Sequence, residues 1–222
     1  WSSDVCSSDL QAQFDNYSSN VSFIKWLDVE VSDAPAVMSQ AGCVLNNVAY
    51  FIGGKNSSLS QVNTIVKYNI DSNSWSHSSS KLPLISSGTA TTLNDTIYYS
   101  FGEHRSTPTS DIWKMENNSW VKCQINGTHV SIARHSCIAY KDSLYYFGGK
   151  IDRTNLSNKI YVYNTKTYEM NQISDNNKSS PSPRCNHCAV LVDDSMIIIG
   201  GSTSKHICGS IYEYNLISGK WS

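Results

Sequence analysis

Two arginine–histidine pairs are the residues whose types and spacing could do chemistry. Arg134 directly precedes His135, and Arg184 lies three residues before His187. Each histidine stands 13 residues before a glycine that ends an apolar run, so the pairs occupy equivalent positions of a repeat. Imidazole and guanidinium groups brought together at such positions could bind a ligand. The other interpretation stays open here: these side chains only bond backbone carbonyls between neighbouring elements.

The cysteines include one C-x-x-C motif, Cys185-Asn-His-Cys188. A structural zinc site would need a second pair at a matching separation, and the sequence has none. A redox motif would open a helix, and no helical pattern surrounds this one. We therefore interpret both cysteines as structural thiols or disulfide partners, with metal or redox chemistry as the alternative, and we expect no metal and no cofactor.

Composition excludes several classes of function. The chain has 17 Lys and Arg against 18 Asp and Glu, so no basic character indicates nucleic-acid binding. Its longest apolar stretches are of about six residues, whereas a transmembrane helix needs about 20, so we predict no membrane span in this chain. The sequence contains no G-x-S-x-G, no H-E-x-x-H and no glycine-rich phosphate loop.

An internal repeat determines the elements that position these residues. Four apolar runs end in a glycine pair or its remnant: VAYFIGG, TIYYSFGE, SLYYFGG and MIIIGG. The first glycines of these runs are Gly53, Gly102, Gly148 and Gly200. They are 49, 46 and 52 residues apart, and a spaced Tyr and Trp follow, as in Tyr68 with Trp75 and Tyr214 with Trp221. Continuous apolar runs of this length are typical of strands that are buried on both faces.

This pattern resembles the kelch repeat, in which an apolar strand and Gly-Gly precede a spaced Tyr and Trp with a period near 50 residues. The resemblance covers the chain from about Phe23 to its end, with Glu103 in place of one second glycine and Met170 in place of one Trp. It implies an all-β fold: a kelch-type β-propeller fragment of about four blades, with four antiparallel strands in each blade. The glycine-ending runs would be second strands, and the outermost strands would carry Trp26, Trp75, Trp120 and Trp221.

The resemblance also implies a function, because propellers present loops from every blade on one rigid face. We predict a non-catalytic kelch propeller that mediates protein–protein or protein–glycan binding. An enzyme of the galactose-oxidase or sugar-epimerase type, built on a kelch propeller, is the alternative. It would need polar groups with perturbed ionisation that converge on the propeller axis. The overall character of the sequence also resembles that of fungal cell-surface kelch proteins.

The chain divides by repeat. Residues 1–10 resemble the in-frame translation of a sequencing-library adapter, and we expect them to pack on nothing. We interpret residues 11–35, with Trp26, as the end of a truncated preceding blade. The predicted blades span 36–84, 85–132, 133–184 and, incomplete, 185–222. We expect the parent chain to continue at one or both ends, so that these blades form an open arc.

The loops after the glycine pairs and the connections between blades should share one face. We expect this face to bind the partner. Its candidate residues are His104, Arg105, Arg134, His135, Lys150, Arg153, Arg184, His187, Lys205 and His206. The turns of the opposite face carry Asp71, Asp95, Glu116, Asp142, Asp193 and Asp194. A chain of net charge −1 would then be electrically two-sided, and we predict an anionic partner, either an acidic peptide loop or a charged glycan.

The same blade geometry implies further features. It places the start of a first strand and the loop after a second strand on one face, so we predict a disulfide between Cys185 and Cys208. Glycosylation sequons exceed the number expected by chance and fall mostly in predicted turns. The candidate sites are Asn56, Asn94, Asn117, Asn126, Asn155 and Asn177. These features predict an extracellular or cell-surface protein, with a cytoplasmic protein as the alternative.

Overall fold

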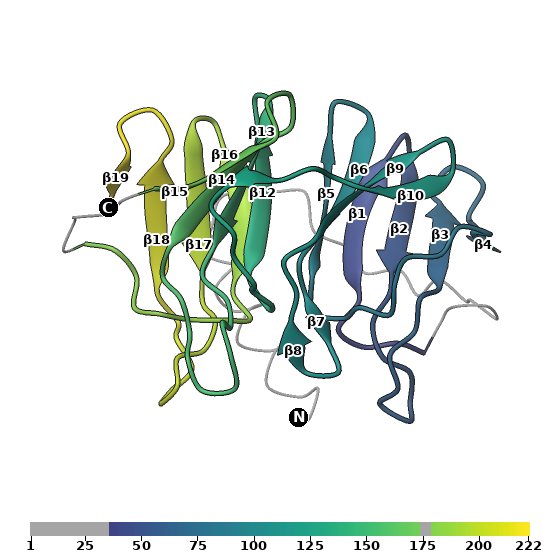
Figure 1. Cartoon of the computed structure of the whole chain (residues 1–222), viewed down its shortest axis with the longest axis horizontal. Helices are drawn as coiled ribbons and strands as arrows, with labels where there is room; N and C mark the ends of the chain where they lie inside the picture. The colour runs from purple at the N-terminus through teal and green to yellow at the C-terminus, as the bar shows by residue number, and fades with distance from the viewer. Residues whose placement is uncertain (1–35, 174–178) are drawn as a thin grey trace, which may run out of the picture. The chain divides into compact units, whose positions relative to one another are not determined.

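Four antiparallel sheets form the blades of a propeller-like arrangement in the computed structural model, which describes residues 36–173 and 179–222 (Figure 1). Blade 1 comprises β1 (Ala41–Leu45), β2 (Val48–Ile52), β3 (Ile65–Asn69) and β4 (Ser74–His77). Blade 2 comprises β5 (Thr89–Leu93), β6 (Thr96–Ser100), β9 (Ile112–Glu116) and β10 (Ser119–Lys122). The described residues form no helix, so the all-β prediction is confirmed.

The other two blades repeat this order. Blade 3 comprises β12 (Ser136–Tyr140), β13 (Ser143–Phe147), β14 (Ile160–Asn164) and β15 (Glu169–Ile173). Blade 4 comprises β16 (Cys188–Val192), β17 (Ser195–Ile199), β18 (Ile211–Asn215) and β19 (Lys220–Trp221). A short segment, β11 (Asn126–Gly127), adds a fifth, parallel strand to blade 3, and β7 (Glu103–His104) and β8 (Thr107–Pro108) form a small hairpin. The expected four strands per blade therefore gain these short additions.

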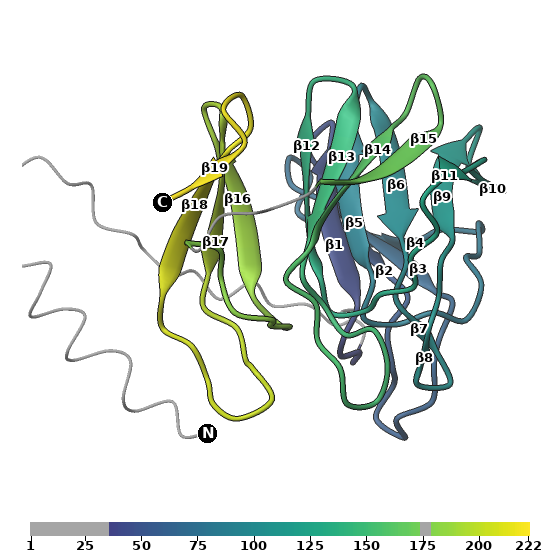
Figure 2. The same cartoon turned by 60° about the vertical axis from the view of Figure 1, so that its left-hand side comes forward.

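The innermost strands line up side by side in chain order. β1 contacts β5, β5 contacts β12, and β12 contacts β16, which brings the starts of all four blades together (Figures 1 and 2). Each glycine-ending run is a second strand, namely β2, β6, β13 and β17, as expected. The chain therefore places equivalent residues of successive repeats next to one another around one axis.

The core lies between the blades. Along β13, Leu144 and Tyr146 pack on blade 2, while Tyr145 and Phe147 pack on blade 4. Successive side chains of a strand point to opposite faces, so a middle strand that is covered on both sides needs apolar residues throughout. Full burial of each such side chain stabilises the fold by about 1.5–3 kcal/mol.

The outermost strands carry the large aromatic residues. Trp75 lies on β4, Trp120 on β10 and Trp221 on β19, as the repeat predicts. The Trp221 ring centroid is 5.2 Å from that of Phe147 in blade 3, so this tryptophan fills the wedge between two blades. Met170 takes the same place on β15 and is fully buried.

One departure from the repeat lies at a different residue from the one expected. Isolated β-bridges show that Glu103 occupies the same repeat position as Lys55 and Lys150, because each of the three pairs with the segment that leads into its own blade. Lys55 and Lys150 directly follow the second glycine of their runs. Phe101 therefore replaces the first glycine, and it adopts a φ of 57° where Gly148 has 66°. The expectation that Glu103 replaces the second glycine is wrong by one residue. The Phe101 side chain is fully buried in the core between blades 2 and 3.

Blade 4 presents one apolar face that no described residue covers. The β-ladder aligns Ile199 with Ile211. The equivalent pair in blade 3, Phe147 with Ile160, is buried against blade 4. Ile199 is 41% exposed and Ile211 is 66% exposed. Residues 1–35, including Trp26, and Asn177 lie outside the described residues, and so do the predictions made for them.

Candidate binding face

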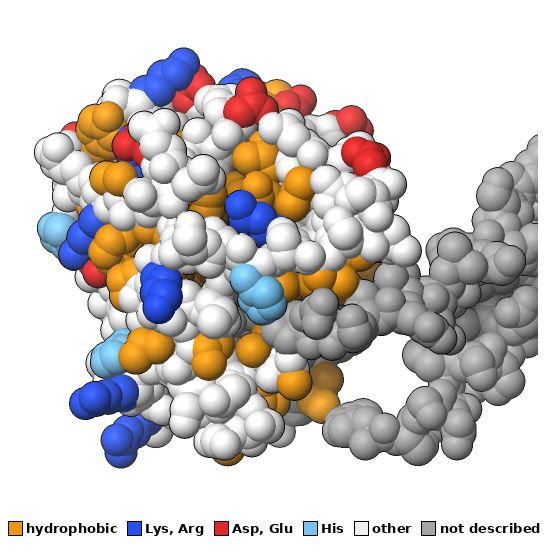
Figure 3. Space-filling model, turned by 90° about the vertical axis from the view of Figure 1, so that its right-hand side faces the viewer, with side chains coloured by type: hydrophobic (Ala, Val, Ile, Leu, Met, Phe, Trp, Pro, Cys, Tyr) orange, Lys and Arg blue, Asp and Glu red, His pale blue; other side chains and the backbone are white. Residues whose placement is uncertain are grey.

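The two ends of the blades carry opposite charge. The loops after β2, β6, β13 and β17 lie at one end, and the hairpin turns between first and second strands lie at the other (Figure 1). An antiparallel hairpin reverses the chain at each strand end, so equivalent loops of every blade must share a side. Figure 3 shows acidic side chains along the upper part of the molecule and lysine, arginine and histidine mainly below. This distribution is the one the sequence predicts.

Six of the ten predicted face residues lie on the loops at the basic end. They are His104, Arg105, Lys150, Arg153, Lys205 and His206. Five of these are exposed and Lys150 is half-buried. His104 and Arg105 belong to the β7–β8 hairpin, and the Nδ1 atom of His104 lies 2.8 Å from the Leu84 carbonyl oxygen. The remaining four candidates have other environments.

Arg134 is held by a buried carboxylate that sequence reasoning missed. Glu103 is 1% exposed, and its Oε1 atom lies 3.3 Å from Lys55 Nζ and 3.5 Å from Arg134 Nη2. Burial alone would raise the pKa of Glu103, but Arg134, Lys55 and the Ser87 hydroxyl outweigh it, and the net pKa lies below its ordinary value. One negative charge is therefore shared by two cations of the basic end, which reduces their combined charge without cancelling it. The available signal was a carboxylate at a repeat position that carries lysine in blades 1 and 3.

Arg184 does not belong to the surface. It is 1% exposed, and its guanidinium donates to the Ser182 and Gly200 carbonyl oxygens at 3.1 and 2.9 Å and to the Ser210 hydroxyl at 3.2 Å. It also lies over the Tyr212 ring, 5.0 Å from the centroid. The prediction that Arg184 contributes to the binding face is wrong, because the guanidinium is buried and its donors are bonded to oxygens of the connection before it and of the loop after β17.

His135 and His187 join neighbouring blades. Nε2 of His135 lies 3.0 Å from the Thr89 hydroxyl of blade 2, and Nε2 of His187 lies 2.9 Å from the Ser136 hydroxyl of blade 3. Burial lowers the pKa of His135 from 6.5 to about 3, with a further contribution from His187. Burial also lowers the pKa of His187 to about 4. Both imidazoles are therefore neutral at physiological pH.

These histidines line a cavity of about 240 Å³ at the propeller axis, together with residues from the starts of all four innermost strands. A hydroxyl beside an imidazole is the first half of a nucleophile–base pair. Here, however, the same pair occurs twice at equivalent repeat positions. His187 also has a backbone contact with Phe147, but no carboxylate or other side chain among the described residues bonds Nδ1 of either histidine, so the third member of a catalytic triad is missing. The arrangement indicates blade packing.

The predicted disulfide is wrong: Cys185 and Cys208 are both free thiols. Ser202 bridges to Cys185 on one side and to Ile207 on the other, so the segment around Ser202 lies between the two cysteines. Neighbouring strands are about 4.8 Å apart, so the two cysteine Cα atoms are separated by roughly 10 Å, beyond the limit of about 7 Å. No group of three metal-binding side chains occurs in the part of the chain that the structure describes.

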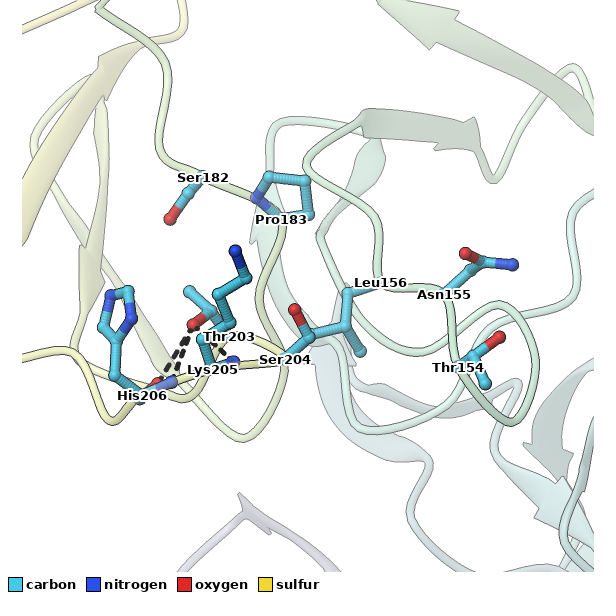
Figure 4. Close-up of a pocket in the computed structure, with 9 residues that line it drawn as sticks. All are labelled: Thr154, Asn155, Leu156, Ser182, Pro183, Thr203, Ser204, Lys205 and His206. Carbon is cyan, nitrogen blue, oxygen red and sulfur yellow. Dashed lines mark hydrogen bonds between the residues drawn. The ribbon is translucent and has the colours of Figure 1, made fainter.

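A pocket of about 310 Å³ lies between the loops of blades 3 and 4. Figure 4 shows its walls, which are Thr154, Asn155 and Leu156 of one loop, Ser182 and Pro183 of the connection, and Thr203, Ser204, Lys205 and His206 of the other loop. The sequence indicated only the last two of these residues. The hydroxyl-bearing residues gave no signal, because serine and threonine are abundant throughout the chain.

The predicted sequons have varied surroundings. Asn94 and Asn117 are exposed in tight turns, with φ angles of 49° and 47°. Asn126 lies in β11 rather than in a turn. The Asn155 side chain donates to Asp152 at 2.8 Å, and Asn56 Oδ1 accepts from two backbone N–H groups of its own loop. Glycosylation of these residues stays a prediction.

Comparison with known proteins agrees with the repeat and the blades. The family model described as KLHDC2/KLHL20/DRC7 Kelch-repeats domain matches residues 87–222. The chain belongs to this kelch-repeat family. The kelch repeat protein M-T8 of Myxoma virus is 25% identical over 82% of this chain and 34% of its own length. Tip elongation aberrant protein 1 of Schizosaccharomyces pombe is 26% identical over 54% of this chain, and Beta-scruin of Limulus polyphemus is 28% identical over 47%.

This kelch chain spans only part of each relative, since it covers 11% of the length of the last two and 34% of the first. Within the described residues, no helix is long and apolar enough to cross a membrane.

Proposed function

We propose that this kelch segment is a non-catalytic protein-binding module that captures an anionic protein through the loops at its basic end. One observation carries the proposal: the basic end keeps cations that no carboxylate compensates. Among the described residues, Arg105, Arg153 and Lys205 form no ion pair, although all three are exposed. At the opposite end Lys166 pairs with Asp142 at 2.9 Å, and Lys141 and Lys220, which form no ion pair with a described residue, lie among turns that carry several acidic residues.

The form of the surface supports a protein partner. Loops from each blade stand side by side on a rigid scaffold, an arrangement that suits recognition of an extended surface. Arginine is well suited to such a face because its planar fork binds carboxylates through two-point contacts. The neutral, repeated imidazole–hydroxyl pairs favour binding over catalysis, because each has a packing role between blades.

Charge reversal tests the proposal. The probe is poly-L-glutamate on a sensor surface, and the analyte is the full chain. The variant Arg105→Glu/Arg153→Glu/Lys205→Glu should bind at least tenfold more weakly, since three exposed pairs of up to about 1 kcal/mol each are lost and replaced by repulsion. Binding by the unaltered chain should weaken as salt rises from 0.05 to 0.3 M.

The matched control carries the same change of net charge at the other end, as Lys141→Glu/Lys166→Glu/Lys220→Glu. All three lysines are exposed on or beside the turns of the acidic end. The control should bind within about twofold of the unaltered chain. Equal loss in both triple variants would show that net charge alone governs capture, and the proposal would then fail.

A further inference from the structure

The basic end is not uniform, because Glu103 neutralises only one part of it. This carboxylate lies in blade 2 and engages Lys55 of blade 1 and Arg134 at the start of blade 3. No described carboxylate forms an ion pair with Arg153 or Lys205, which stand on the loops of blades 3 and 4. Each of the two loops beside the pocket therefore carries one cation without an ion-pair partner among the described residues, and the Asp152 carboxylate stands next to Arg153 in the chain.

The pocket combines three kinds of surface. Leu156 and Pro183 give it an apolar wall, and Ser182 and Ser204 give it hydroxyl groups, while the Thr154 hydroxyl donates to Asp152 at 3.2 Å. Figure 4 shows the Lys205 side chain rising from its loop toward the connection that carries Ser182 and Pro183. An ammonium group at the rim beside an apolar wall fits a ligand with a short hydrocarbon stem and an anionic tip.

Both loops are braced by hydrogen bonds from their own side chains. Asp152 Oδ1 accepts the backbone N–H groups of Thr154 and Asn155, each at 2.8 Å. Thr203 Oγ1 accepts the backbone N–H groups of Lys205 and His206 at 3.2 and 3.1 Å. A binding site whose loops are already fixed loses little conformational entropy when it is occupied.

We infer that this pocket receives a glutamate side chain from an acidic loop of the protein partner. The carboxylate meets the Lys205 ammonium and the neighbouring hydroxyls, and the two methylene groups lie against Leu156 and Pro183. A volume of about 310 Å³ is at the lower end of the range for ligand pockets, which suits one side chain rather than a large molecule. The inference rests on the proposed function and assigns the anionic contact to this pocket.

The experiment uses the full chain labelled with 15N and two peptides, acetyl-Gly-Glu-Gly-amide and its glutamine analogue. Amide chemical shifts are followed as each peptide is added. The glutamate peptide should shift the resonances of residues 154–156 and 203–206, and the glutamine peptide should bind at least threefold more weakly. Lys205→Met should weaken glutamate binding about threefold or more, as expected for an exposed ion pair.

Two further variants separate the pocket from its surroundings. Ser204→Trp should fill the pocket and abolish the shifts, while unchanged dispersion elsewhere in the spectrum shows that the fold is kept. Lys81→Met removes an exposed lysine on the connection between blades 1 and 2, outside the pocket and outside the loops proposed to bind the partner. It is the matched control and should change the affinity by less than 1.5-fold.

Each opposing result has a distinct meaning. Equal weakening by Lys205→Met and Lys81→Met would overturn the pocket, and the proposed function would still be decided by its own two triple variants. Equal affinity for the glutamine peptide would overturn the carboxylate contact. Tighter binding of 3′-sialyllactose than of the glutamate peptide would overturn the acidic peptide in favour of a charged glycan. If the unaltered chain did not bind poly-L-glutamate, the proposed function itself would be refuted.

Discussion

The two buried histidines should make the stability of the propeller depend on pH between about 6.5 and 4. His135 has a pKa of about 3 and His187 a pKa of about 4 in the folded chain, against 6.5 for an exposed histidine. The unfolded chain therefore binds two protons in this range that the folded chain does not bind. Folding stability is complete above pH 6.5, and it is lost as the pH falls from 6.5 toward the folded values.

The magnitude follows from the size of the shifts. At pH 5 each histidine is almost fully protonated in the unfolded chain and almost neutral in the folded chain. Each then reduces the free energy of unfolding by about 2 kcal/mol relative to pH 7.5, and the pair reduces it by about 4 kcal/mol. That loss is a large fraction of a typical stability of about 5–15 kcal/mol.

The carboxylates with lowered pKa values do not contribute to this change of stability between pH 7.5 and 5.0. Asp142, Asp152 and Glu103 have pKa values lowered by their hydrogen bonds and ion pairs, so their contributions to stability are lost only at more acidic pH. Urea denaturation monitored by tryptophan fluorescence at pH 7.5, 6.5, 5.5 and 5.0 would measure the effect. Tryptophan is a suitable probe because Trp221 packs between blades.

The test uses glutamine in place of histidine. The double variant His135→Gln/His187→Gln keeps an amide that can reach Thr89 and Ser136 but cannot titrate, so its stability should change by less than about 1 kcal/mol over the same range. His104→Gln is the matched control, because His104 is exposed, and its profile should follow that of the unaltered chain. A double variant that loses about 4 kcal/mol in parallel with the unaltered chain would refute the assignment.

Three substitutions test other contacts by the same denaturation assay. Arg184→Met should cost about 2–4 kcal/mol because buried carbonyls lose their donors, whereas exposed Arg153→Met should stay within about 0.5 kcal/mol. Gly148→Ala should cost at least about 1 kcal/mol, since φ is 66° and a Cβ would lie 2.8 Å from a backbone oxygen; Gly209→Ala, with open space around it, should be near neutral. Glu103→Gln should cost about 1–2 kcal/mol and strengthen poly-L-glutamate binding severalfold, because it frees two cations; unchanged affinity would contradict the neutralisation.

The strands and the sides of the blades could be predicted from the sequence because they depend on local patterns. An apolar run that ends in glycine specifies a strand with two buried faces, whichever residues meet it. Met170 shows the limit of this specificity: it occupies a tryptophan position and is fully buried, so the repeat requires volume rather than one residue type. The sharing of one side by equivalent loops then follows from antiparallel geometry.

The errors concern contacts that depend on register between segments far apart in the sequence. The Cys185–Cys208 pair was expected from sides of a blade, but the segment around Ser202 separates the two. Arg184 was expected at the surface, but the loop after β17 closes over it. Neither contact has a local signal, because each depends on which residue of a distant loop stands opposite.

The charge pattern arises where the repeat fixes the backbone and leaves the side chain free. Lys55, Glu103, Lys150 and Ser202 occupy the same position in successive blades, and each pairs with the segment that leads into its own first strand. Backbone hydrogen bonds hold this position, so its side chain can change sign without cost to the blade. In blade 2, Glu103 at this position forms ion pairs with Lys55 and Arg134. In blade 4, Ser202 at this position has no charge, so it provides no carboxylate for Lys205. The anion-binding region that we propose for this propeller would therefore be set by the residues that do not repeat.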